Sequence, residues 1–165
     1  MWFQKQLTLW GLYSLPELEE GKERELIESL SDSSRIAVVK GDEIHPLDLN
    51  TGLGAGRYIN EALEDDVRIC YIPGALTESI IKAIEPEKFK RVKFVLKDPT
   101  KIFIDAINWK QLAKKGFKVE VLKNIKVAAV TVNPFAPAGY SFDSDALLSE
   151  MKKLITDIPV IDVRK

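Results

Sequence analysis

Short apolar runs alternate with segments of helical spacing along the chain, and this alternation constrains the fold more than any other feature of the sequence. Helical segments of about 10–13 residues separate most of the runs, which is typical of β-α-β units. The sequence therefore predicts an α/β fold with a mostly parallel sheet and helices on both faces, a three-layer Rossmann-like arrangement. The apolar runs lie at residues 36–39, 67–72, 92–96, 118–122, 127–132 and 159–163.

We expect the sheet to be organised around residues 127–132, which show no polar alternation. Such a run is typical of a strand that is covered on both faces. We expect residues 67–72, 92–96 and 127–132 to lie parallel in one sheet, with the turns that follow them at a common edge. Residues 118–122 alternate between polar and apolar side chains, so we place them near an edge of the sheet.

Capping residues mark several helix boundaries. Ser14, with Glu17 three residues later, has the form of a capping box and predicts a helix that ends near Leu30. Asp105 predicts the start of another helix, and Gly116 predicts its end. Residues 3–9 alternate weakly, which indicates a first strand.

The length of 165 residues predicts a single α/β domain over residues 1–165. The aperiodic segment 41–50 is the candidate for a weak boundary inside it. Because the chain begins directly in a strand-like stretch, the alternative interpretation is a fragment of a longer protein.

Charge and composition argue against several classes of partner. With 24 basic and 25 acidic residues, the chain has no electrostatic reason to bind nucleic acid or an anionic membrane. No apolar run approaches the length of about 18 residues that a membrane span needs. Cys70 is the only cysteine, which excludes an intramolecular disulfide and fits a cytoplasmic protein. His45 has no companions at ligand spacing, so we predict no metal site, and no cofactor is evident.

The glycine-rich run at residues 52–56 precedes a helix-like segment, where backbone N–H groups can bind a phosphate. A Walker loop ends in Gly-Lys-Ser/Thr, whereas this run continues as Arg57-Tyr58, and its third glycine comes one residue too early for the Rossmann fingerprint. We interpret the run as a turn and a helix start. The alternative is a weaker anion site formed by Gly52, Gly54, Gly56 and Arg57.

The turns after three of the predicted strands hold the main candidate ligand-binding residues. Lys97 and Lys101 suit an anion, and Asp98 suits a hydroxyl group or a metal-bound water. Thr77 and Asn133 offer neutral hydrogen bonds. In the alternative interpretation, Thr77 caps its helix, Asp98 makes a turn, and the lysines are solvated. The candidates are Gly74, Thr77, Lys97, Asp98, Thr100, Lys101 and Asn133.

Three stretches together resemble a known family: Ile72-Pro73-Gly74-Ala75-Leu76-Thr77, Lys97-Asp98-Pro99-Thr100-Lys101-Ile102-Phe103, and Ala129-Val130-Thr131-Val132-Asn133-Pro134 continuing to Gly139-Tyr140-Ser141-Phe142-Asp143. They resemble the C-terminal half of the reactivase-type accessory protein found with bacterial lysine 5,6-aminomutase, a cobalamin- and pyridoxal-phosphate-dependent enzyme. The resemblance covers most of the chain from about Ser31 onward and implies a role in reactivating the mutase. That family carries a Gly-Lys-Thr loop in an earlier half, which this chain lacks. The resemblance therefore implies the non-nucleotide part of a larger protein and transfers no catalytic residue.

We expect a non-catalytic accessory or regulatory α/β domain that binds a small anionic ligand or a protein partner. One alternative is a small enzyme that acts on an anionic metabolite at the carboxyl ends of the strands, using Lys97, Asp98 and Thr77. Another is a structural oligomerisation domain that forms a homo-oligomer, which an exposed apolar first strand with Trp2 and Trp10 would favour.

Overall fold

The computed structural model describes residues 15–30, 33–48, 54–125, 128–135, 139, 141–156 and 158–163, and the chain divides into two compact units, Met1–Ile125 and Lys126–Lys165. Helices and strands are mixed in both units, so the α/β class is confirmed. The segment 41–50 lies inside the first unit, and a weak boundary there stays a prediction. That residues 1–165 form a single domain stays a prediction.

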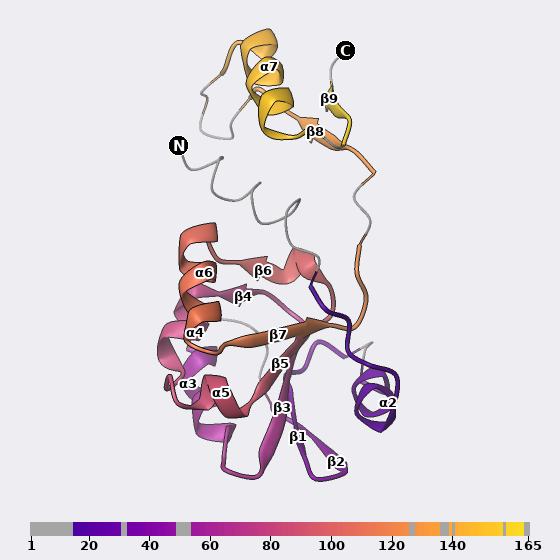
Figure 1. Ribbon diagram of the computed structural model, residues 1–165, viewed down its shortest axis with the longest axis vertical. Coiled ribbons are helices and arrows are strands. Elements are labelled where there is room, and N and C mark those ends of the chain that lie inside the picture. The colour runs from indigo at the N-terminus through magenta and orange to yellow at the C-terminus, as the bar shows by residue number, and fades with distance from the viewer. Residues whose placement is uncertain are drawn as a thin grey trace. The chain divides into compact units, whose positions relative to one another are not determined.

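The first unit contains a five-stranded sheet in the order β2-β1-β3-β5-β7 (Figure 1). β3, β5 and β7 run parallel to one another, whereas β1 is antiparallel to both β2 and β3. The sheet is therefore mixed, and the expected parallel arrangement holds for β3, β5 and β7. The strands are β1 (Ala37–Lys40), β2 (Glu43–Pro46), β3 (Val67–Ile72), β5 (Lys93–Leu96) and β7 (Lys118–Val121).

The antiparallel strand β2 arises from a tight hairpin that the sequence did not predict. Lys40 pairs with Glu43, so Gly41 and Asp42 form a two-residue loop. Gly41 has a φ of 54°, the positive value that the first position of such a loop requires. The side chains of β2 are exposed or half-buried, so its sequence carries no apolar alternation to reveal it.

Helices cover both faces of this sheet. Figure 1 shows α2 on one side and α3 to α6 on the other. Ile27 of α2 is buried in one cluster with Val39 and Val95, whereas Ile59 of α3 is buried in a second cluster with Cys70. The helices are α2 (Lys22–Glu28), α3 (Ala55–Ala62), α4 (Glu78–Ala83), α5 (Lys88–Arg91) and α6 (Ala106–Lys114), and no described helix is long and apolar enough to cross a membrane.

The helix predicted from Ser14 to Leu30 is wrong in its first part. Ser14 lies outside the described residues, and α2 begins only at Lys22, after Gly21. The backbone before it lies alongside β7: the Leu18 N–H donates to the Val121 carbonyl at 2.9 Å, and the Val121 N–H donates to the Pro16 carbonyl at 3.0 Å. These bonds cover the outer edge of β7, which is the last strand of the five, as expected for an edge strand.

The second unit contains β8 (Val130–Val132), α7 (Ser144–Leu154) and β9 (Val160–Asp162). β8 pairs in parallel with β9 in a sheet of its own. The prediction that residues 127–132 lie in one sheet with β3 and β5 is therefore wrong, and β7 occupies the place beside β5. The expected cover on both faces is also wrong, because Thr131 in β8 is exposed and Val130 is only half-buried. An apolar run carries no information on which strand lies beside it.

Replacing Gly56 by Ala tests the contact between α3 and α4. A Cβ atom at Gly56 would lie 2.8 Å from the Cβ atom of Ala83 and 2.8 Å from the carbonyl oxygen of Ile80. We expect Gly56→Ala to lower the free energy of unfolding by about 1–3 kcal/mol, because the two helices must move apart. Urea unfolding measures the change. Glu61→Ala, at an exposed position of the same helix, should change stability by less than about 0.5 kcal/mol, and an equal effect of both variants would contradict the close packing.

Candidate functional site

The loops that follow β3 and β5 are held side by side. β4 (Leu76–Thr77) in the first loop pairs in parallel with β6 (Ile102–Phe103) in the second. Because β3 and β5 are themselves adjacent and parallel, both loops leave the sheet at its carboxyl edge. This edge contains six of the predicted residues: Gly74, Thr77, Lys97, Asp98, Thr100 and Lys101.

Polar side chains at this edge stabilise the loops themselves. Thr77 is the N-cap of α4, and its hydroxyl group lies 2.8 Å from that of Ser79. The carboxylate of Asp98 accepts hydrogen bonds from the backbone N–H of Thr100, at 2.8 Å, and from the Thr100 hydroxyl group. These contacts fix the shape of the edge. They also agree with the interpretation of Thr77 and Asp98 as capping and turn residues.

Asn133 does not follow a strand of the five-stranded sheet. It follows β8 in the second unit, where its side-chain oxygen accepts a hydrogen bond from the Phe135 N–H at 3.1 Å. The expected site of three turns is therefore reduced to two in the first unit, because β8 pairs with β9 rather than with β5.

The described part of the glycine-rich run forms the turn and the first residues of α3. Gly52 lies outside the described residues. Gly54 precedes α3 with a φ of 84°, and Gly56 lies against α4. Arg57 is exposed and pairs with Glu61 at 2.9 Å, and this hydrogen bond raises the pKa of Arg57. These contacts fit the interpretation as a turn and helix start, and the weaker anion site stays a prediction.

Tyr71 is a candidate that the sequence did not single out. Its side chain is fully buried on the α2 face of β3, one residue before the strand ends, and its hydroxyl group has no hydrogen-bond partner among the described residues. Burial and the negative charge of nearby Asp98 raise the pKa of Tyr71. A buried hydroxyl group without a hydrogen-bond partner is costly, so Tyr71 is an unusual residue among the otherwise apolar core side chains around it. In the sequence, Tyr71 lies between Cys70 and Ile72, so its pattern did not differ from that of an ordinary core residue.

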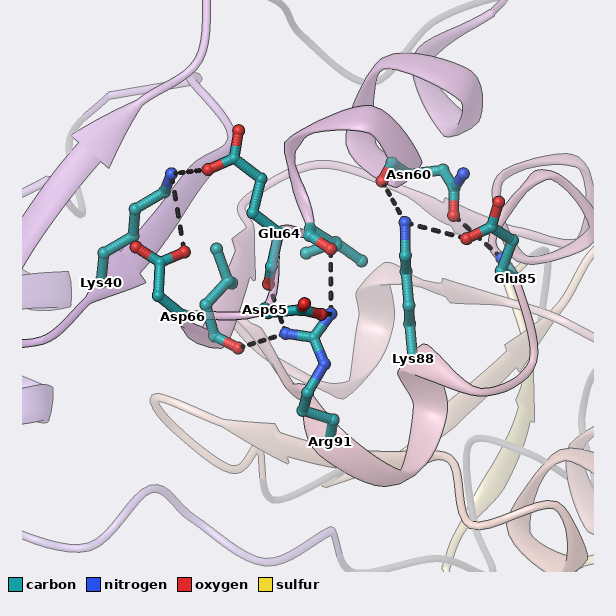
Figure 2. A network of polar contacts seen from close by, with 10 residues as sticks. Lys40, Asn60, Glu64, Asp65, Asp66, Glu85, Lys88 and Arg91 are labelled. Atoms are coloured by element: carbon teal, nitrogen blue, oxygen red, sulfur yellow. Dashed lines mark hydrogen bonds and ion pairs between the residues drawn. The ribbon is translucent and has the colours of Figure 1, made fainter.

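A polar network lies around the C-terminal end of α3 (Figure 2). Arg91 donates to the carbonyl groups of Leu63, at 2.9 Å, and Val67, at 3.1 Å. Lys88 donates to the Asn60 carbonyl at 2.7 Å. Carbonyl groups at a helix C-terminus lack partners within the helix and carry partial negative charge, so these cations stabilise the end of α3. We therefore assign the network to the fold rather than to a ligand site.

Two further residues that the sequence singled out lie apart from this edge. The His45 ring is exposed on β2, 3.8 Å from the Glu43 carboxylate. Among the described residues there is no group of three or more His, Cys, Asp or Glu side chains that could hold a metal ion. Cys70 is buried in β3, and burial raises the pKa of its thiol to about 12.

No protein-family model, no curated protein and no solved structure matches this chain. The resemblance to the accessory protein of lysine 5,6-aminomutase therefore stays a prediction. The functional conclusion below depends on the geometry of the described residues.

Burial of Cys70 predicts slow reaction with thiol reagents. At about pH 8, a pKa of about 12 leaves almost none of the reactive thiolate, whereas an exposed cysteine has a pKa of about 8.5. We expect Ellman's reagent to label the native protein at least about 100-fold more slowly than the protein unfolded in guanidinium chloride. Rapid stoichiometric labelling in native buffer would contradict the burial of this residue in the sheet.

Proposed function

We propose that this chain is a non-catalytic accessory or regulatory domain whose first unit binds a small anionic ligand at the carboxyl edge of β3 and β5. The pairing of β4 with β6 carries the proposal, since it holds the two candidate loops together. The proposal includes a three-layer Rossmann-like arrangement, and open α/β sheets bind ligands at this edge. An accessory role beside an aminomutase, which the resemblance implies, is part of the same proposal.

The chemistry of the edge favours an anion. Lys97 is exposed directly after β5, and Lys101 is half-buried in the same loop, so both bring positive charge to the loop that follows β5. The carboxylate of Asp98 accepts a hydrogen bond from the Thr100 N–H and therefore stabilises the loop. The proposal assigns the Tyr71 hydroxyl group, which has no partner among the described residues, the role of a hydrogen-bond donor to an oxygen of the ligand.

Binding, rather than reaction, is the better-supported role. Thr77 and Asp98 are held in capping contacts within their own loops, and Cys70 keeps its proton through burial. The contacts of Thr77 and Asp98 hold the backbone of the two loops in place, and a fixed arrangement of polar groups is what recognition of an anion requires.

Neutralising the two lysines tests the anion site. We expect Lys97→Gln/Lys101→Gln to weaken binding of succinate or inorganic phosphate by about 3- to 10-fold, the effect of removing two positive charges near the surface. Backbone amide NMR titration measures the affinity and reports whether the shifts cluster at residues 74–77 and 97–101. The control Lys110→Gln/Lys114→Gln makes the same change of charge on α6. Equal losses in both variants, or no titration of the native protein, would refute the site.

Replacing Tyr71 by Phe distinguishes a hydroxyl group that binds the ligand from one that is hydrogen-bonded within the protein. Because it has no partner among the described residues, Tyr71→Phe should leave the free energy of unfolding unchanged or raise it by up to about 1 kcal/mol. If the hydroxyl group meets the ligand, the same variant weakens succinate or phosphate binding. Urea unfolding and the NMR titration measure the two effects. A clear loss of stability would mean that the hydroxyl group already has a partner within the protein.

A further inference from the structure

A groove of about 350 Å³ lies between α4, α5 and α6, and none of its lining residues belongs to the carboxyl-edge site. This volume is at the lower end of the range for small-molecule pockets, about 300–1,000 Å³. The groove is therefore large enough for one ring system or a short chain. It is a second site, independent of the proposed function.

The floor of the groove is apolar and preformed. Ile81, Phe89, Ile104 and Leu112 line it, and each is at most 9% exposed because the same side chains belong to the core of the first unit. The ring of Phe89 packs edge-on against Phe117, with centroids 5.1 Å apart. A floor fixed by core packing does not have to be ordered when a ligand binds, which favours affinity.

The polar rim carries a net positive charge. The Glu78 carboxylate accepts hydrogen bonds from the Asn108 side-chain amide at 2.8 Å and from Lys82 at 3.1 Å. These two bonds lower the pKa of Glu78, so the group stays ionised and its charge is balanced by Lys82. Lys115 also lines the groove and has no ion pair among the described residues. Among the residues that line the groove, two cations and one anion leave the Lys115 charge without a carboxylate partner, although the Asp105 carboxylate lies nearby and accepts a hydrogen bond from Asn108 at 3.0 Å.

We propose that this groove binds a small organic anion, with its apolar body on the floor and its carboxylate or sulfonate at Lys115. Gln111, at the rim one turn before Lys115, offers an amide donor to the same acid group. A neutral apolar molecule would gain no electrostatic attraction from Lys115, and an organic cation would be repelled by it. The combination of floor and rim therefore selects the anion.

Three probes of one shape test the predicted charge preference: 2-naphthoate, 2-naphthamide and 2-naphthylmethylammonium, measured by isothermal titration calorimetry. We expect 2-naphthoate to bind about 2- to 5-fold more tightly than the amide, the effect of one exposed charge, and the cation to bind most weakly. Lys115→Gln should remove this preference, whereas Lys110→Gln, on the opposite side of α6, should retain it.

A filling variant tests the location. Gln111 is exposed on α6, so Gln111→Trp places a large side chain over the floor without altering the core. We expect it to weaken 2-naphthoate binding by at least about tenfold, whereas Lys110→Trp adds the same side chain outside the groove and leaves binding unchanged. Thermal unfolding confirms that both variants fold.

The proposal is overturned if 2-naphthoate does not bind, if Gln111→Trp and Lys110→Trp bind it equally well, or if all three probes bind alike. The last two results would indicate adsorption to other exposed apolar side chains, such as Phe103 and Ile107. Lys97→Gln/Lys101→Gln should leave 2-naphthoate binding unchanged. The proposals for the groove and for the carboxyl-edge site are therefore tested independently.

Discussion

The first unit depends on burying both faces of β3, its central strand. From Ile69 to Ile72 every side chain is at most 1% exposed, although successive side chains point to opposite faces of the sheet. Burial on both sides demands a layer on each, which α2 provides on one face and α3 to α6 on the other. The parallel order of β3, β5 and β7 follows, because each connection carries a helix that returns the chain to the same end of the sheet.

Close packing of the helical layer sets the position of the loops. Gly56 lets α3 approach α4 without a side chain between them, and Arg91 anchors the C-terminal end of α3 to the start of β3. α4 begins where β4 ends, so the same packing holds the loop that pairs with β6. The position of the candidate edge therefore depends on how the helices pack, whereas the contacts of Thr77 and Asp98 fix its local shape.

Two kinds of binding surface result from this arrangement. At the carboxyl edge, polar side chains mostly stabilise their own loops. The buried Tyr71 hydroxyl group has no hydrogen-bond partner among the described residues. Between α4 and α6, core side chains form a floor, and the Lys115 charge at the rim has no carboxylate partner among the lining residues. The first surface suits a small polar anion, and the second suits an anion with an apolar body.

Local sequence determined most of the elements. Asp105 caps α6 by accepting hydrogen bonds from Ile107 and Asn108, as its position before a helical segment predicts, and the apolar run of β3 predicts a buried strand. Such signals depend on neighbours within a few residues. Only the tertiary structure decided that Val130–Val132 form β8 in a sheet with β9, that residues 16–18 lie beside β7, and that the Tyr71 hydroxyl group has no partner within the described residues. Strand pairing and the environment of a buried group depend on segments far apart in the chain, and no local pattern records which segments meet.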